Sequence, residues 1–284
     1  VTLSKSKFLL MKKIALIFLG LSTQIFFAQA NRFIYQVTMK TDSTNRNDIK
    51  TETAYLDATP EKSIFYGEKR LQRDSLFTRM RQTNGASFDR SQIQNLRSNI
   101  DYTVEKDFKT GKNTFNSRIA RDQYSYEEDR PMEWKILPET AKIGEYKTQK
   151  AETDFAGRKW AAWFTTDVPF QDGPYKFSGL PGLIVKVEDS KGDYSFDLKE
   201  TKKIASPTVF EQRGNIIKVK RTVFNQQLEK FRKDPSSFSP PSPPMSVRGN
   251  SGGMRSQTNP NQRKEFEQRM KDELKTKNNP IELK

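Results

Sequence analysis

The sequence contains neither cysteine nor histidine. Without cysteine the chain has no disulfide and no thiol nucleophile, so a hydrophobic core alone must stabilise it. Without histidine, serine–histidine and cysteine–histidine nucleophile activation is excluded, together with every zinc site that needs an imidazole ligand. Catalysis would have to rest on carboxylates, lysine, tyrosine or oxygen-ligated metals. The composition therefore favours a protein that is not an enzyme, and it predicts neither a cofactor nor a metal.

Dense blocks of like charge are also missing. The chain has 50 basic and 35 acidic residues, a formal net charge of +15, but the two signs are mixed along its length. A nucleic-acid interface would need clustered basic residues, typically with aromatic side chains or a known module. We therefore expect no nucleic-acid partner, and we interpret the charge as that of a soluble surface.

The longest apolar stretch is too short for a membrane span, which needs roughly 20 residues. Lysines at positions 12 and 13 precede it, and Ala-Gln-Ala at 28–30 follows it. A basic start, a short apolar run and a small-x-small ending are typical of a cleavable secretory signal peptide. We interpret residues 1–30 as a start-site extension plus this signal, and we expect no transmembrane span.

Export and the missing cysteine together restrict where the protein acts. The mature chain is expected to begin near Asn31, and it has no cysteine that could accept a lipid anchor. We therefore expect a soluble or peripherally bound protein in the periplasm, with release outside the cell as the open alternative.

Short alternating patterns dominate residues 31–233. Apolar side chains alternate along 33–40, which predicts a strand with one buried face. Further strands are predicted at 51–57, 63–66, 101–108, 114–119, 123–128, 145–153, 158–166, 183–187, 193–198 and 215–219, and helices at 67–82, 92–100 and 222–233. This pattern predicts a single α+β domain over 31–233, a mainly antiparallel curved β-sheet with one or two packed helices.

The composition changes after this domain. Residues 234–261 are rich in proline, serine, glycine and asparagine, and they offer too little apolar area to fold. Residues 262–277 could form a polar, basic helix with little apolar face. We therefore predict a disordered C-terminal tail over 234–284, made of a Pro/Ser/Gly-rich linker and a basic end.

The six residues Gly179, Leu180, Pro181, Gly182, Leu183 and Ile184 form the most distinctive motif. Related signals flank them, namely Phe-Ala-Gly-Arg at 155–158 and Asn-Pro-Ile-Glu-Leu at 279–283. With these flanks the sequence resembles the GLPGLI family, an exported Bacteroidetes family of uncharacterised function, most strongly over 130–190. The resemblance implies a cell-envelope location and no reaction.

The motif has a physical interpretation of its own. Pro181 fixes φ and Gly182 supplies a positive φ, which predicts a type II turn at the entry to a strand. Gly179 would let the backbone pass close to a neighbour such as Trp163. The alternative is a functional one, in which residues 173–182 form a loop that faces a ligand.

Aromatic side chains gather near the motif, on the strand at 158–166 and in the loop that follows it. The candidate binding residues are Trp160, Trp163, Arg158, Tyr175 and Phe177. Core packing is the alternative role for the tryptophans. Arg158 would hold an anionic ligand, or it would pair with Glu152 or Asp154. We predict no catalytic residue and no metal ligand.

Two functions are consistent with these features. The first is a non-catalytic binding or interaction module of the cell envelope, whose ligand would be a lipid-like or peptide molecule or an outer-membrane transport complex. The second is a carboxylate-dependent hydrolase, which needs two acidic side chains facing one cleft. The acidic run at 127–129 is a candidate for such chemistry, and a solvated turn is its alternative interpretation.

Overall fold

The computed structural model describes residues 30–83, 90–211, 214–238 and 260–283. Most of the predicted export signal and residues 239–259 of the predicted linker lie outside the described residues. The first strand begins at Ala30, the last residue of the predicted signal. Among the described residues, no helix combines the length and the apolar composition that crossing a bilayer requires.

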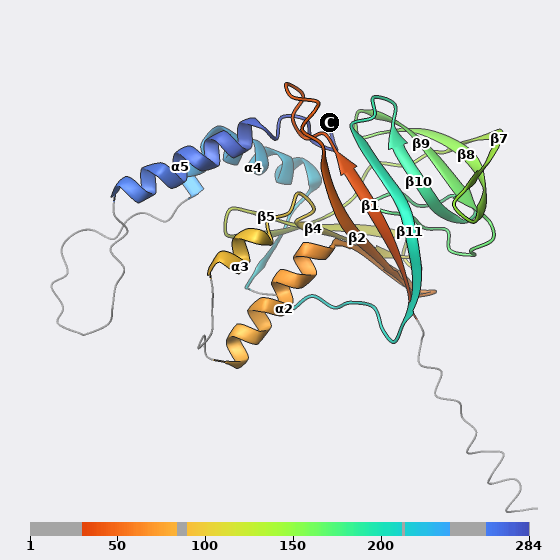
Figure 1. The fold of residues 1–284 in the computed structure, drawn as a ribbon, viewed down its shortest axis with the longest axis horizontal. Helices are drawn as coiled ribbons and strands as arrows, with labels where there is room; N and C mark the ends of the chain where they lie inside the picture. Colours follow the sequence, from red (N-terminus) through yellow and green to blue (C-terminus); the bar gives the residue numbers. More distant parts are fainter. Residues whose placement is uncertain (1–29, 84–89, 212–213, 239–259, 284) are drawn as a thin grey trace, which may run out of the picture.

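A single 12-stranded sheet forms the body of the protein (Figure 1). Its strands are β1 (Ala30–Met39), β2 (Lys50–Ala58), β3 (Lys62–Gly67), β4 (Tyr102–Asp107), β5 (Lys112–Ile119), β6 (Asp122–Glu127), β7 (Lys135–Ile143), β8 (Tyr146–Phe155), β9 (Arg158–Thr165), β10 (Leu183–Asp189), β11 (Tyr194–Ile204) and β12 (Ile216–Lys218). The order across the sheet is β12-β6-β5-β4-β3-β2-β1-β11-β10-β9-β8-β7. Every pairing is antiparallel except that of β12 with β6, which confirms the predicted α+β fold.

The helices lie outside the sheet. They are α2 (Glu68–Gln82), α3 (Arg90–Asn95), α4 (Arg221–Lys233) and α5 (Pro260–Lys275), with a short 3₁₀ turn at Pro235–Phe238. In α4, Phe224 is the buried residue, and its ring packs on Phe115 and Tyr126 of the sheet. The predicted helices at 67–82 and 222–233 correspond to α2 and α4. The predicted helix at 92–100 overlaps α3 only over 92–95, and residues 96–100 are not helical.

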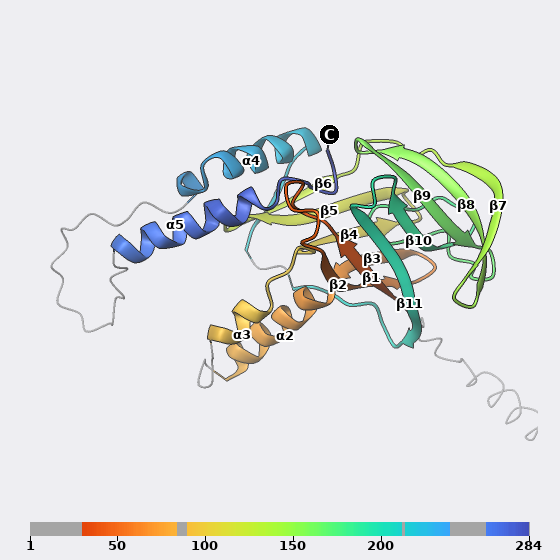
Figure 2. The same cartoon turned by 45° about the horizontal axis from the view of Figure 1, so that its top comes forward.

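The sheet curves strongly, and the loop at 166–182 between β9 and β10, here called the core loop, lies inside the curve. Lys106 of β4 contacts Asp172 of this loop at 2.6 Å, while Trp160 of β9 packs on Phe177 of the same loop with ring centroids 4.7 Å apart. In the strand order, β4 and β9 are six steps apart, about 28 Å in a flat sheet. One short loop reaches both only because the strands bend around it (Figures 1 and 2).

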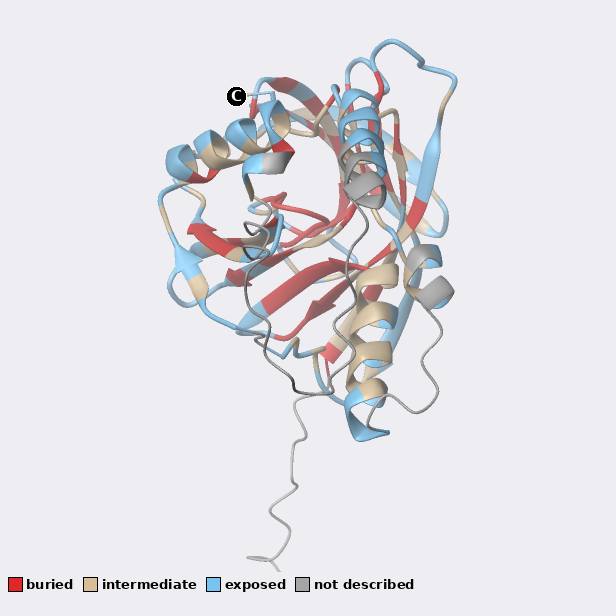
Figure 3. Cartoon of the chain, turned by 90° about the vertical axis from the view of Figure 1, so that its left-hand side faces the viewer, coloured by how far each residue is buried: buried red, intermediate tan, exposed pale blue. Residues whose placement is uncertain are grey.

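Aromatic side chains of the core loop fill the concave face. Phe177 is fully buried. Its ring contacts those of Trp134, Phe155, Trp160, Tyr175 and Phe196. Figure 3 shows the buried residues concentrated on the strands that surround this interior. The inner face of the sheet is therefore packed with the protein's own aromatic residues.

Sequence patterns did not predict strand β7, at one edge of the sheet. Its sequence carries Pro138 and several charged residues, and most of its side chains are exposed. Pairing with β8 is irregular between Ile136 and Thr140. An edge strand needs hydrogen bonds on one side only, so it tolerates a proline and a bulge that would disrupt a central strand.

The glycine-rich motif forms a tighter turn than the predicted type II turn. Gly182 N donates a 2.8 Å hydrogen bond to Leu180 O, which closes a three-residue turn around Pro181. The φ of Gly182 is +155°, well above the roughly +80° of a type II turn. This conformation carries the chain straight into β10, where Leu183 pairs with Thr165.

The sequence suggested a close backbone approach at Gly179, but in the structure this approach is made by Gly182. A Cβ built on Gly182 would lie 1.9 Å from the carbonyl oxygen of Thr165, whereas one built on Gly179 would have open space around it. The buried Leu180, Leu183 and Ile184 then anchor the motif in the core. These contacts support the structural interpretation of the motif.

Substituting Gly182 with alanine tests this close approach. The added methyl group would clash with backbone, so we expect a loss of about 3 kcal/mol or more in the free energy of unfolding. Gly144→Ala is the control, because Gly144 also has a positive φ but open space around it; it should cost only about 1 kcal/mol. Urea unfolding measures both, and equal losses would contradict the proposed clash.

Candidate binding site

Four of the five candidate binding residues lie inside the protein. Trp160, Tyr175 and Phe177 are at most 2% exposed, and Arg158 is also buried. Trp160 Nε1 donates a hydrogen bond to the Phe155 carbonyl at 3.2 Å. Trp163, on the opposite face of β9, is half-buried. A ligand could reach the four buried residues only by displacing internal contacts. The binding role of all five candidates stays a prediction.

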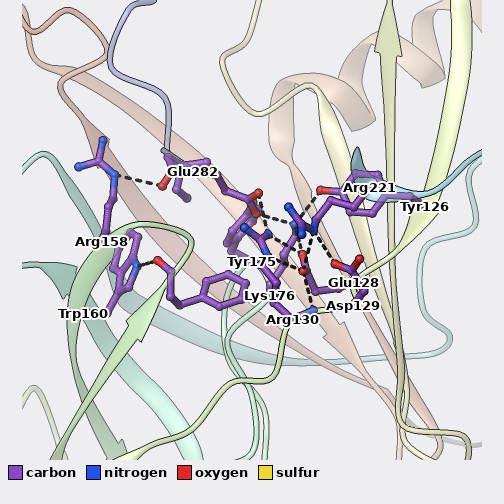
Figure 4. Close-up of polar contacts among 12 residues, drawn as sticks. Tyr126, Glu128, Asp129, Arg130, Arg158, Trp160, Tyr175, Lys176, Arg221 and Glu282 are labelled. Atoms are coloured by element: carbon purple, nitrogen blue, oxygen red, sulfur yellow. Dashed lines mark hydrogen bonds and ion pairs between the residues drawn. The ribbon is translucent and has the colours of Figure 1, made fainter. Parts of the chain in front are cut away.

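A buried lysine organises the polar part of this region (Figure 4). Lys176 follows Tyr175 in the core loop, and its side chain is 1% exposed. Its ammonium group donates to Tyr126 Oη at 2.8 Å and to Glu128 Oε2 and Glu282 Oε1, each at 2.5 Å. All three ammonium protons therefore have an acceptor, as a buried charge requires.

Further groups close this cluster around Glu282. Arg130 donates to Glu128 through Nε at 2.7 Å and to Glu282 Oε2 through Nη2 at 2.8 Å. The hydroxyl of Tyr175 donates to Glu282 as well. We call the five residues around Glu282 the lysine clasp, which consists of Tyr126, Glu128, Arg130, Tyr175 and Lys176.

The electrostatics of the lysine clasp favour the ionised form of Glu128. Burial alone would raise the pKa of Glu128, but its hydrogen bonds with Arg130 and its ion pair with Lys176 more than offset burial and lower the pKa to about 2. Burial and the charge of Glu282 raise the pKa of Tyr175 well above its ordinary value. Tyr175 is therefore a neutral hydrogen-bond donor at neutral pH.

A second buried cation, Arg158 at the start of β9, lies near the clasp. Its Nη1 donates to Asp189 at 2.8 Å and to Asp193 at 3.1 Å. Pairing with Glu152 or Asp154, one of the two alternatives for Arg158, is wrong, because these acids pair with Lys150 and Lys159. Strand alternation explains this, because Arg158 lies on the buried face of the hairpin, whereas its neighbour Lys159 is exposed.

Arg158 and the lysine clasp hold one extended stretch of chain, residues 279–283, here called the tail segment. Arg158 donates to Asn279 Oδ1 at 2.6 Å and to the carbonyls of Pro280 at 2.7 Å and Ile281 at 3.0 Å. The next residue, Glu282, enters the lysine clasp, and Leu283 N donates to Ala156 O at 2.8 Å. The segment is therefore recognised through its main chain and through two side chains.

The other end of the tail segment is fixed against β1 and β11. Asn279 N donates to Thr41 O at 2.9 Å, and its Nδ2 donates to Lys40 O at 2.7 Å. The hydroxyl of Tyr194 donates to Asn279 O at 2.6 Å. The composition of 234–284 predicts a disordered tail, but residues 279–283 are ordered, because their polar groups find partners far away in the sequence.

Anchoring the tail segment also fixes the end of α5 against the N-terminal strands. A polar hollow of about 370 Å³ lies between them. Its lining residues are Thr41, Asp48, Ile49, Lys50, Thr51, Glu52, Lys69, Arg97, Ser98, Asn99, Glu273, Thr276 and Lys277. The hollow is large enough for a small ligand, and one of its walls depends on the anchored tail segment.

The acidic run at 127–129 divides among separate cationic partners. Glu127 pairs with Lys112 at 2.8 Å, and Asp129 pairs with Arg221 at 2.5 Å. Glu128 and Glu282 approach each other in the lysine clasp, but Lys176 and Arg130 bind both. Within the described ranges, no group of three or more acidic side chains is placed to hold a metal ion. Carboxylate-dependent hydrolysis stays a prediction without a structural observation in its favour.

Replacing Lys176 with methionine tests the energetic role of the clasp. It leaves two buried carboxylates with one cation fewer, so we expect a loss of about 3–5 kcal/mol in the free energy of unfolding. Lys159→Met is the matched control, because the Lys159–Asp154 pair is solvent-exposed and its loss should not be measurable. Denaturant unfolding of both variants gives the answer, and a tolerated Lys176→Met would contradict a structural role for the clasp.

The low pKa of Glu128 predicts an acid-dependent stability. Its pKa is lower in the folded chain than its ordinary value of 4.5, so unfolding takes up a proton. The stability that Glu128 contributes is full above about pH 4.5 and is lost as the pH falls towards 2. Unfolding free energies measured across this range should fall more steeply for the wild type than for Glu128→Gln. Parallel curves would show that the carboxylate is not stabilised in the fold.

Comparison with known proteins adds a partial family match and a structural likeness. No curated protein matches the chain. Two solved structures, titled "Structure of PNGF-II in P21 space group" and "Structure of PNGF-II in C2 space group", are 18% identical, with TM-scores of 0.50 and 0.49. Each match covers 72% of this chain and 34% of the other. The chain thus spans about a third of PNGF-II. The likeness to the first of these structures, with the TM-score of 0.50, concerns the fold alone.

The family match falls on the part of the chain that builds the site. Residues 156–186 match a family described as "Protein of unknown function (Porph_ging)". This stretch runs from the turn before Arg158, through β9 and the core loop, to the start of β10. The match is consistent with an uncharacterised Bacteroidetes-type family, and its residues include both buried cations that hold the tail segment.

Proposed function

We propose that this chain is a GLPGLI-family protein exported to the periplasm, where it acts as a non-catalytic interaction module that binds an extended peptide segment. In the structure its own residues 279–283 occupy the proposed site. The observation that carries the proposal is the grip of two buried cations, Arg158 and Lys176, on that segment.

The contacts of the tail segment are those of a peptide-recognition site. Three of its carbonyls accept hydrogen bonds from buried side chains, at Asn279, Pro280 and Ile281. Main-chain bonds of this kind provide affinity for any extended chain, and side-chain contacts select the sequence. Here the selecting contacts are those of Asn279 and Glu282, which favour segments of the form Asn-x-x-Glu.

Preorganisation supports the same proposal. Asp189 and Asp193 hold Arg158, while Glu128 and Tyr126 hold Lys176. These partners belong to the sheet and its hairpins, so both cations are oriented by groups other than the tail segment. A site held in its binding geometry loses little conformational freedom on binding. A second chain that offers a similar segment would therefore meet a prepared site.

Exchange of the tail segment for a free peptide tests this function. A labelled peptide with the sequence of residues 276–284 is titrated into the chain from Asn31 onward, and binding is followed by fluorescence anisotropy. In the variant Glu282→Gln the chain's own segment competes less well, because charge-assisted hydrogen bonds are lost. We expect the peptide to bind this variant about tenfold more tightly than the wild type.

Two controls make the result specific. Glu265→Gln removes the same charge from an exposed position on α5 and should leave peptide binding unchanged. A peptide that itself carries glutamine at the position of Glu282 should bind more weakly than the native peptide. If neither chain takes up the native peptide, the tail segment is only an internal tether and the proposed function is wrong.

A further inference from the structure

A second polar site lies where α2 meets the sheet, away from the tail segment. Arg70 and Arg73, one turn apart on α2, border a small hollow together with Arg118 of β5 and Gln123 of β6. Arg118 and Gln123 are directly paired across the two strands. We call these four residues and the space between them the arginine hollow.

The cations of this hollow are only partly compensated. Asp101 accepts hydrogen bonds from both helix arginines, and Leu96 O accepts one from Arg73. Arg118 forms no ion pair with any residue of the described chain. Two acids, Asp74 and Glu211, also border the hollow, and Glu211 pairs with Arg81. Asp74 acts electrostatically on Arg70. Of the three arginines that line the hollow, Arg118 is the one without an ion pair in the described part of the chain.

Two residues that line this space each carry a buried polar atom without a hydrogen-bond partner among the described residues. These atoms are Nε of Arg70, whose side chain is 11% exposed, and Oε1 of Gln123. A buried, unpaired polar group is unfavourable by about 1–3 kcal/mol, and two at one hollow indicate a missing occupant. Rotating the Gln123 amide by half a turn exchanges its oxygen and nitrogen, so that it too can present a donor.

The size of the hollow restricts the occupant. Its volume of about 40 Å³ accommodates roughly three water-sized groups at 10–15 Å³ each. That space fits three oxygens of a tetrahedral oxyanion, with the fourth directed out of the hollow, and it is too small for a sugar ring or a nucleobase. Phe210 covers one side, with its ring centre 5.1 Å from the guanidinium carbon of Arg70, while Arg118 is exposed. The rest of a larger molecule would leave past Arg118.

We propose that the arginine hollow binds a phosphate or sulfate group through Arg70 Nε–H, the Arg118 guanidinium and the Gln123 amide. Guanidinium groups bind tetrahedral oxyanions through two parallel hydrogen bonds, which suits this geometry. Burial and the neighbouring arginines lower the pKa of Arg70, while Asp101 opposes this effect. An anion in the hollow would stabilise the charged form.

Calorimetric titration with three kinds of probe tests the site and identifies the source of the group. The probes are inorganic phosphate and sulfate, the ester glycerol 3-phosphate, and vesicles of phosphatidylcholine with and without phosphatidic acid. Preference for the ions, the ester or the anionic vesicles shows whether the group is free, part of a small molecule or part of a lipid. In each case the Nε–H resonance of Arg70 should shift in NMR spectra.

Paired variants separate a defined site from general attraction to a basic protein. Arg118→Ala should weaken binding by about tenfold, because a charged hydrogen-bond donor is lost. Arg121→Ala removes the same charge from the adjacent exposed turn, and at physiological salt it should change the affinity by less than about twofold. The proposal is overturned if no probe binds saturably, or if the two variants weaken binding equally.

Discussion

The ion pair between Lys106 and Asp172 is the contact on which the rest of the structure depends. Both side chains are 1% exposed and their charged atoms are 2.6 Å apart. The two remaining ammonium protons of Lys106 bond to the carbonyls of Gly173 and Phe177. Lys106 belongs to β4 and its acceptors to the core loop, so this contact holds the loop against the far side of the curved sheet.

The position of the core loop then determines the geometry of the candidate binding site. With the loop fixed, Phe177 fills the concave face, and its neighbour Lys176 points towards Glu128 and Glu282. The clasp holds the tail segment, and the tail segment holds the end of α5. A chain of contacts thus runs from one buried ion pair in the sheet to the wall of the polar hollow.

Local periodicity predicted most of the fold because most strands bury one face. The strands at 33–40 and 158–166 both follow from such patterns. The structure joins β8 to β9 by a two-residue turn at 156–157, where the positive φ values of Ala156 and Gly157 fit a type I′ turn. Strand β7 escaped detection because an edge strand of exposed polar residues has no period that burial imposes. The tail segment escaped detection for a related reason, since its order depends on partners more than 100 residues away.

The sequence indicated part of the site and missed its most important member. Arg158 and Tyr175 were candidates, and both contact the tail segment. Lys176 was overlooked, although a lysine between Tyr175 and Phe177 in an otherwise apolar stretch is itself a signal. Such a lysine must either reach solvent or find buried acceptors. No local pattern shows which of these occurs, because the acceptors Glu128 and Glu282 come from distant parts of the chain.

The charge balance around Arg158 differs from the charge balance in the lysine clasp. Arg158 faces Asp189 and Asp193, and Arg46 also pairs with Asp193. The two arginines and the two aspartates therefore balance in charge without the tail segment. The lysine clasp differs, because Lys176 and Arg130 face Glu128 alone once Glu282 is removed.

An uncompensated charge would then remain where water is largely excluded, and such a state is strongly unfavourable. The clasp therefore needs an acidic group from the bound segment, whereas Arg158 needs only carbonyl oxygens. On the proposed peptide-binding function, Glu282 would determine whether the site is filled, and Asn279 and the main chain would determine the register. Because an empty clasp is disfavoured, an incoming segment would have to insert its own carboxylate as Glu282 leaves, and exchange is then expected to be slow and specific for acidic segments.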